Sequence, residues 1–362
     1  MKLTIADIIN CTEGKLLCGN KNINCKGFSK DTRTIKKDDI YIGIKGEKFD
    51  GNLFWQKALD NGAMGVIVEN IDFTEEMLIQ YKDKIIIKVK DTLQALYKIA
   101  SYKRNLYNVP VIAITGSVGK TSTKDIVANV VEQKYKTLKT IGNNNNNIGL
   151  PFTILNAPED IEAMVLEMGM NHFGEIHLLS KIAKPNVCII TNIGTSHIGN
   201  LGSRENILKA KLEILDGAEH PCLILNNDND LLHNWYENNK HNGNIQTYGI
   251  YHKSDIQAEN IVLNEKNSEF DVWIDDVTQK IQVPVGGEHF VLNSLCAITV
   301  GKVLHIQNEL IKKGIETFTL TKNRMEITEL KQGIKIINDA YNSSVESVRA
   351  SIEYMKHMKA NR

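Results

Sequence analysis

Short apolar runs alternate with stretches of helical hydrophobic spacing through the middle of the chain. The apolar runs predict buried strands, which lie at 111–115, 163–168, 186–192 and 222–226. The helical spacing predicts helices, which lie at 120–134, 174–182, 204–216 and 290–305. Apolar strands that alternate with crossover helices form a doubly wound parallel sheet, and ligands of such a sheet bind at the carboxyl ends of its strands.

The pattern changes on both sides of this region, which predicts three domains in an α/β chain. We expect a small N-terminal α/β domain at 1–88, the doubly wound domain at 89–318, and a further segment at 319–362. That last segment holds one strand and one helix, which cannot form a core, so it is either an incomplete domain or packs on its neighbour. The remaining predicted elements are strands at 39–45, 65–68, 84–88 and 334–338, helices at 53–61, 91–106 and from 345 onward, and an antiparallel edge at 255–284.

Composition points to an ordinary cytosolic enzyme. The chain has 362 residues, 43 basic and 43 acidic side chains and a formal net charge of zero, so nothing draws the whole surface to nucleic acid or to an anionic membrane. No apolar run reaches membrane-spanning length, and the N-terminus does not resemble a signal peptide. The six cysteines form no C-x-x-C pair, so neither a metal site nor a disulfide is predicted.

The stretch Thr115-Gly-Ser-Val-Gly-Lys-Thr121 carries the strongest chemical signal. It follows a β-branched strand and opens a helix, the setting in which backbone N–H groups bind phosphate. Lys120 would neutralise phosphate oxygens, and the Thr121 hydroxyl would hold Mg²⁺. The strict G-x-x-x-x-G-K-[ST] pattern is not met, because Ile114 occupies its first glycine position. A glycine-rich turn is the alternative, but the flanking strand and helix favour nucleotide binding.

Polar residues follow two other predicted strands. Glu167 ends one strand, and His197 follows the next within a few residues. Because parallel strands end at one edge of the sheet, Thr121, Glu167 and His197 are predicted to converge on one or two Mg²⁺ ions. Each residue taken singly is as well explained as a solvated surface group.

The run Asn143-Asn-Asn-Asn-Asn147 is the most unusual composition in the chain. Asparagine runs are common in disordered or turn segments, but this one lies between predicted elements, before Gly149 and Pro151. Amide side chains both donate and accept hydrogen bonds, which suits a sugar or peptide substrate.

Taken in order, these motifs resemble the Mur ligases, the ATP-dependent enzymes that build the peptidoglycan stem peptide. The resemblance covers residues 28 to 350, and the asparagine-rich segment is most similar to the D-alanyl-D-alanine-adding (MurF) branch. It rests on the phosphate loop, the segment 142–151, Glu167-Met-Gly169, His197, Lys209-Ala-Lys211, and the N-terminal motifs Asp31-Thr-Arg33, 39–46 and Phe49-Asp-Gly51.

The resemblance implies a role for individual residues. Lys120, Glu167, His197 and Lys211 would be catalytic, and Lys211 matches a lysine that relatives carbamylate. The implied metal ligands are Thr121, Glu167, His197 and carbamylated Lys211. The implied ATP contacts are Gly116, Ser117, Val118, Gly119, Lys120, Thr121, Ser122, Asn293, Arg324 and Asp339. The implied contacts with the UDP-muramoyl substrate are Thr32, Arg33, Asn143, Asn145 and Asn146.

The implied reaction is amide formation through an acyl phosphate, with ATP and Mg²⁺. D-Alanyl-D-alanine would be joined to UDP-N-acetylmuramoyl-tripeptide in the cytoplasm by a monomer, for cell wall biogenesis, cell shape and cell division. Only the opening of the family's third, Rossmann-like domain is present, at 319–362, so we expect this form to bind its nucleotides but to ligate poorly. Two alternatives stay open: a Mur-type ligase with another amino substrate, as in the MurE branch, and a nucleotide- or UDP-sugar-binding module without ligase activity.

Overall fold

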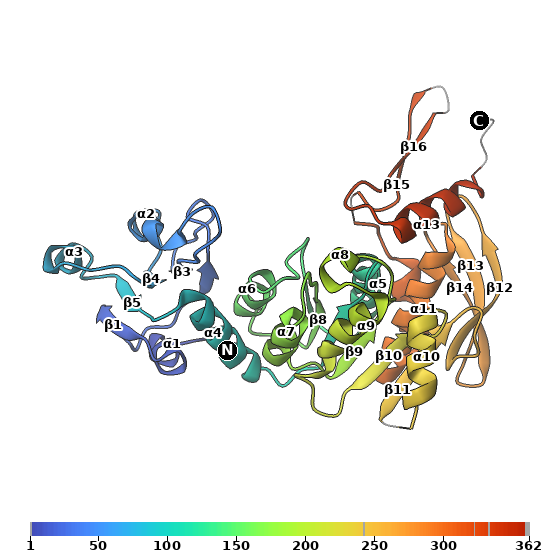
Figure 1. Cartoon of the computed structure of the whole chain (residues 1–362), viewed down its shortest axis with the longest axis horizontal. Coiled ribbons are helices and arrows are strands. Elements are labelled where there is room, and N and C mark those ends of the chain that lie inside the picture. The colour runs from blue at the N-terminus through green and yellow to red at the C-terminus, as the bar shows by residue number, and fades with distance from the viewer. Residues whose placement is uncertain (1, 242, 322, 332–333, 359–362) are drawn as a thin grey trace. The chain divides into compact units, whose positions relative to one another are not determined.

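The computed structural model describes residues 2–241, 243–321, 323–331 and 334–358 (Figure 1). The chain packs into two compact units. The first comprises Met1–Asn108 and Ile141–Asp160, and the second comprises Val109–Thr140 and Ile161–Arg362. The predicted division into three domains stays a prediction.

The first unit is built on a mixed sheet with the strand order β1-β5-β4-β3-β2, in which only β1 is antiparallel to its neighbour. Trp55, Leu59 and Val66 are buried in its core together with Tyr41, whose hydroxyl donates to the Gly51 carbonyl at 2.8 Å. The strands are β1 (Lys15–Cys18), β2 (Gly27–Ser29), β3 (Asp39–Ile42), β4 (Gly65–Val68) and β5 (Ile85–Lys88). The helices are α1 (Ile5–Thr12), η1 (Gly51–Phe54), α2 (Trp55–Asp60), α3 (Glu75–Gln80), α4 (Thr92–Asn105) and α6 (Gly149–Leu155).

Helix α6 reaches the first unit from a distant part of the sequence and packs against α4 and β2. The Asn146 side-chain oxygen accepts hydrogen bonds from the N–H groups of Ile148 and Gly149, so it caps the start of α6. At the other end, Lys103 Nζ donates to the Leu155 carbonyl at 2.6 Å. Part of the asparagine run is therefore a helix cap.

Within the described residues, the second unit contains a nine-stranded sheet with the order β14-β13-β12-β11-β10-β9-β6-β8-β7. The strands from β7 to β12 are parallel, which confirms the predicted doubly wound sheet, and β12, β13 and β14 form the predicted antiparallel edge. Its strands are β6 (Val111–Thr115), β7 (Thr137–Lys139), β8 (Ala163–Glu167), β9 (Val187–Ile190), β10 (Cys222–Asn226), β11 (Asn244–Gly249), β12 (Ile256–Leu263), β13 (Ser268–Ile274) and β14 (Val277–Val283).

The order of these strands indicates where the sheet binds its ligands. From β6 the chain moves to β7 at the sheet edge, returns to β8, and then crosses to β9 on the other side of β6. The carboxyl end of β6 is thus the point where the direction of winding reverses, and doubly wound sheets bind their ligands at such a point. The predicted phosphate loop begins there.

Helices cover both faces of the sheet. Helices α5, α11 and α12 pack on one another, whereas α7 packs against β6 and α10 against β10. Since the crossovers through α5 and α7 run in opposite directions along the sheet, right-handed connections place these two helices on opposite faces. The helices of this unit are α5 (Lys120–Val131), α7 (Glu175–Ala183), α8 (Ile198–Leu201), α9 (Arg204–Leu212), η2 (Glu213–Leu215), α10 (Asp230–Asn239), α11 (Glu288–Val303) and α12 (Asn308–Glu316).

The C-terminal segment contributes β15 (Glu326–Glu329), β16 (Lys335–Asn338) and α13 (Val345–Met355). β15 and β16 form an antiparallel pair, and the Ser344 hydroxyl accepts from the Ser347 N–H to cap α13. Tyr354 of α13 is buried in the core of the second unit, so α13 packs on that unit. Across the described residues, the helices are too short or too polar to cross a membrane.

Candidate nucleotide-binding and catalytic site

The loop between β6 and α5 has the geometry of a phosphate-binding loop. Gly119 precedes the first residue of α5 with φ at 78°, in the left-handed region that glycine adopts without steric cost. The Asn192 side-chain oxygen accepts from the N–H groups of Ser117 and Val118, both at 3.0 Å. Gly194 N–H donates to the Ser117 hydroxyl at 2.9 Å. The segment that follows β9 therefore holds the loop in shape.

Gly116 is required by close packing against Thr191, the residue that follows β9. A Cβ atom at this position would lie 1.9 Å from the Thr191 hydroxyl oxygen, which donates to the Val118 carbonyl at 2.8 Å. We expect Gly116→Ala to lower the free energy of unfolding by about 1–3 kcal/mol, the usual cost of overpacking. Thermal melting measures this change. Gly199→Ala is the control, because a Cβ atom there meets nothing within 4 Å, and an equal loss in both variants would contradict the packing argument.

Lys120, the first residue of α5, folds its side chain back onto the loop. Its Nζ donates to the carbonyl oxygens of Gly116 at 2.8 Å and Ser117 at 3.3 Å. Burial lowers the pKa of Lys120, the Glu167 carboxylate counteracts this, and the Arg324 guanidinium lowers the pKa further. The ammonium group is therefore held at the loop by carbonyl oxygens and the field of one carboxylate.

Three predicted site residues meet at the Thr121 hydroxyl. It donates to Glu167 Oε2 at 3.0 Å, and Arg324 donates to it at 3.3 Å. Glu167 is only 2% exposed, and its N–H donates to the Thr140 hydroxyl at 3.0 Å. The Arg324 guanidinium also lies 4.1 Å from the centre of the Tyr341 ring, a cation–π contact that orients it.

His197 and Lys211 belong to the same electrostatic environment. Burial lowers the pKa of His197, and the nearby positive charges of Lys211 and Lys120 lower it further, which favours the neutral imidazole that binds metals. Its φ of 67° lies in the left-handed region, which is uncommon for residues with a side chain but which histidine adopts more readily than most. Lys211 is 1% exposed, its side chain has no hydrogen bond or ion pair among the described residues, and burial places its pKa well below the usual value.

The residues at this point suit magnesium. The hydroxyl of Thr121 and the carboxylate of Glu167 present oxygen atoms 3.0 Å apart, and Mg²⁺ prefers one or two protein oxygens with water and phosphate completing its shell. Over the described ranges, His, Cys, Asp and Glu side chains form no metal-binding group of three or more. A magnesium ion here would therefore depend on nucleotide oxygens as well as on the chain.

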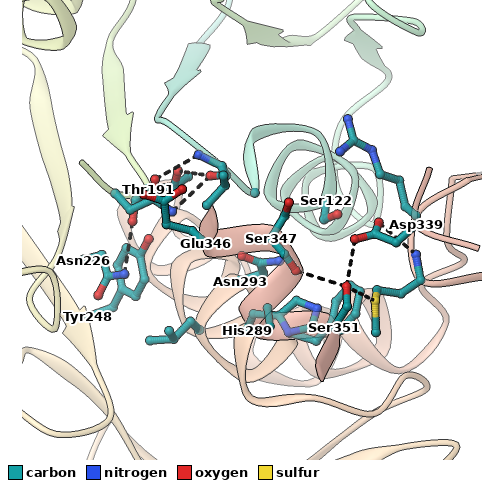
Figure 2. Close-up of a pocket in the computed structure, with 18 residues that line it drawn as sticks. Ser122, Thr191, Asn226, Tyr248, His289, Asn293, Asp339, Glu346, Ser347 and Ser351 are labelled. Carbon is teal, nitrogen blue, oxygen red and sulfur yellow. Dashed lines mark hydrogen bonds between the residues drawn. The ribbon is translucent and has the colours of Figure 1, made fainter. Parts of the chain in front are cut away.

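A pocket of about 130 Å³ lies beside the phosphate loop (Figure 2). It brings together residues from four predicted segments: the loop residues Val118, Gly119 and Ser122, then Asn293, Arg324 and Asp339. Asn293 accepts from the Thr123 hydroxyl at 2.9 Å, so it is fixed to α5. Eight further residues with polar side chains line the pocket and were not predicted as site residues: Thr191, Asn192, Asn226, Tyr248, His289, Glu346, Ser347 and Ser351.

His289, which lines the pocket, is expected to make the free energy of unfolding depend on pH. Burial lowers its pKa from the ordinary 6.5 to about 4, with Asp339 opposing. Because the unfolded chain takes up this proton at higher pH than the folded chain, the unfolding free energy falls as pH decreases from 6.5 to 4. We expect a loss on the order of 2 kcal/mol, reduced from the full shift because the ring is partly exposed, and a smaller loss in His289→Gln. Urea unfolding at pH 7 and pH 4 measures both; equal losses would contradict this assignment.

The predicted substrate residues lie in the first unit and do not line this pocket. Arg33 pairs with Asp31 at 2.7 Å, and the Thr32 carbonyl accepts from the Asn61 side chain at 2.8 Å. Asn143, Asn145 and Asn146 belong to the segment before α6, where Asn146 acts as the cap. Their contact with substrate stays a prediction.

Comparison with known proteins agrees with this geometry. A family profile described as the Mur ligase middle domain matches residues 114–301, and one described as Mur ligase family, catalytic domain, matches residues 25–104. The chain therefore belongs to the Mur ligase family, as its motifs predicted. A relative from Bacillus subtilis (strain 168), named UDP-N-acetylmuramoyl-tripeptide--D-alanyl-D-alanine ligase, is 37% identical over 99% of this chain and 76% of its own length.

Solved structures give the same result. MurF from Acinetobacter baumannii superposes with a TM-score of 0.89 at 29% identity, covering 99% of this chain and 77% of that one. MurF from Thermotoga maritima, solved in complex with ADP, superposes with a TM-score of 0.81 at 27% identity, covering 92% of this chain and 75% of that one.

Proposed function

We propose that this chain is an ATP-dependent ligase that joins D-alanyl-D-alanine to UDP-N-acetylmuramoyl-tripeptide in peptidoglycan synthesis. The observation that carries the proposal is the meeting of Lys120, Thr121, Glu167 and Arg324 at the end of β6, in a chain 37% identical to a ligase of that name. The ADP complex of the Thermotoga maritima relative supports ATP as the nucleotide.

The reaction begins with transfer of the ATP γ-phosphate to the terminal carboxylate of the tripeptide. The amine of D-alanyl-D-alanine then attacks the acyl phosphate, and the tetrahedral intermediate expels phosphate. Such phosphoryl transfer depends on positioning and charge neutralisation, so Lys120 and Arg324 act by binding phosphate oxygens. The loop N–H groups and the start of α5 add positive potential.

Thr121 and Glu167 hold magnesium in this proposal, with His197 and a carbamylated Lys211 as further ligands. Bound Mg²⁺ supplies additional neutralisation of the phosphate charge. Lys211 is suited to carbamylation, because burial lowers the pKa of its amine and so favours the uncharged form that reacts with carbon dioxide.

The muramoyl substrate is assigned to the first unit. We expect Thr32, Arg33, Asn143, Asn145 and Asn146 to contact its uridine and sugar groups. Asn146 would do so through its side-chain NH₂ group, because its side-chain oxygen already accepts hydrogen bonds at the start of α6. The same proposal includes a cytoplasmic monomer that acts in cell wall biogenesis, cell shape and cell division.

A product assay tests the proposal. The chain is incubated with ATP, Mg²⁺, UDP-N-acetylmuramoyl-tripeptide and D-alanyl-D-alanine, and the pentapeptide product is detected by mass spectrometry together with released phosphate. Parallel reactions replace D-alanyl-D-alanine with a diamino acid such as lysine. Product only with that amine supports a MurE-like ligase, and substrate binding without any product supports a binding module; either result contradicts the proposal.

A further inference from the structure

Glu346, near the start of α13, connects this helix to the segment that follows β9. Its Oε1 atom accepts from both the N–H of Thr195 at 2.7 Å and the Thr195 hydroxyl at 2.9 Å. Thr195 lies two residues before His197 and follows Gly194, whose N–H holds the phosphate loop through Ser117. One oxygen of Glu346 is therefore fully used in fixing α13 beside the loop.

The second oxygen of Glu346 has no such partner. Oε2 is buried, lacks a hydrogen-bond donor among the described residues, and belongs to a side chain that lines the pocket beside the phosphate loop (Figure 2). Leaving a carboxylate oxygen buried without a donor is costly, so such atoms in native proteins call for an explanation. A ligand that donates a hydrogen bond inside the pocket provides one.

The direction of the Glu346 pKa shift is consistent with a carboxylate that accepts hydrogen bonds. Burial raises the pKa of the Glu346 carboxyl, but hydrogen bonding, including that from Thr195, outweighs burial, and the pKa is lowered overall. An ionised carboxylate accepts hydrogen bonds and repels phosphate. Its partner on a nucleotide must therefore be a neutral donor.

We infer that Glu346 is a nucleotide-positioning residue whose Oε2 accepts a hydrogen bond from a ribose hydroxyl of ATP. ATP has three neutral donor groups: the two ribose hydroxyls and the adenine amine. The ribose is joined directly to the phosphates, and Glu346 lies beside the segment that holds the phosphate loop, which favours a hydroxyl over the amine at the far end of the nucleotide. Carboxylates also recognise ribose hydroxyls in other doubly wound sheets.

Gly194 makes this position of the carboxylate possible. A Cβ atom on residue 194 would lie 2.5 Å from Glu346 Oε1, so any larger residue would displace the carboxylate from Thr195. The inference rests on the proposed function only in taking ATP as the nucleotide. It adds a residue from the C-terminal segment that discriminates between nucleotides.

Equilibrium binding of nucleotides tests the inference without any turnover. Dissociation constants are measured by calorimetry, with Mg²⁺ and no muramoyl substrate, for ATP, 2′-deoxy-ATP, 3′-deoxy-ATP and purine riboside triphosphate, which lacks the amine. The wild type is expected to bind one deoxy nucleotide about tenfold more weakly than ATP, the usual effect of a hydrogen bond to a charged group. Glu346→Ala is expected to bind ATP and that deoxy nucleotide equally, and Glu346→Gln to keep a reduced preference.

Glu353→Gln is the matched control, because Glu353 is exposed on the same helix and pairs with Lys356. It is expected to keep the wild-type preference, and thermal melting confirms that each variant is folded. Equal binding of all nucleotides by the wild type, or a full preference in Glu346→Ala, overturns the inference. A preference against the purine nucleotide that Glu346→Ala abolishes assigns the amine instead, and also overturns it. Ribose discrimination without pentapeptide product would contradict the proposed function alone.

Discussion

Replacing Lys120 by methionine is expected to lower kcat for amide formation by on the order of a thousandfold. Methionine keeps the length of the side chain and removes its charge. The Lys120 ammonium lies against the carbonyl oxygens of Gly116 and Ser117, inside the loop that would surround the phosphates. A positive charge at this position acts most strongly in the transition state, when negative charge moves between phosphate oxygens. Its removal therefore lowers mainly kcat.

Phosphate release at saturating substrate concentrations measures this effect. Lys181→Met is the matched control, because Lys181 is exposed on α7 and away from the phosphate loop. It is expected to stay within about twofold of the wild type, as surface substitutions usually do. A Lys120→Met variant that keeps a tenth of the wild-type rate would contradict the expected thousandfold contribution of the ammonium.

Replacing Lys211 by alanine is expected to lower activity by about a hundredfold, the usual loss when a group that supports a metal site is removed. In the proposed carbamylation, the buried Lys211 amine would attack carbon dioxide, a C–N bond would form and one proton would leave the nitrogen, so that a neutral amine would become a carbamate anion. That anion would balance the positive field of Lys120, which acts on Lys211 in the structure. Depleting carbon dioxide should therefore reduce wild-type activity, and bicarbonate should restore it.

The carbamate itself is observable by ¹³C NMR after incubation with labelled carbon dioxide. The wild type is expected to show a carbamate signal that Lys211→Ala lacks. Lys209→Ala is the matched control, because Lys209 lies on the same helix α9 but is exposed. A carbamate signal that disappears in Lys209→Ala, or full activity of Lys211→Ala, would contradict the assignment.

The parts of the fold that were predictable are those set by local sequence. The β-branched run Val111–Thr115 and the glycines after it form a strand and loop with few alternatives, and both were confirmed. Helix α10 (Asp230–Asn239) was missed because only Leu232 on it is buried, which leaves a weak hydrophobic pattern. Helix α6 was missed because its short sequence contains Pro151 in the first turn, which a helix tolerates there.

The site residues that could be predicted were likewise those marked by their local sequence. Glu167 was found from sequence because it ends an apolar strand, and the structure joins it to Thr121. His289 and Glu346 were not found, because each acquires its role from packing between segments distant in sequence. Asn146 was predicted as a substrate contact, and its contribution as a helix cap depends on the start of α6.

The first unit is not continuous in sequence, since residues 109–140 of the second unit separate Asn108 from Ile141. The buried side chains of α6, including Leu150 and Ile154, pack against α4. They are synthesised only after residues 109–140. During synthesis, the N-terminal sheet therefore emerges from the ribosome before the helix that completes its packing. A fragment ending at residue 108 lacks that helix and leaves the apolar face of α4 in water. No single cut in this chain separates the two units from each other.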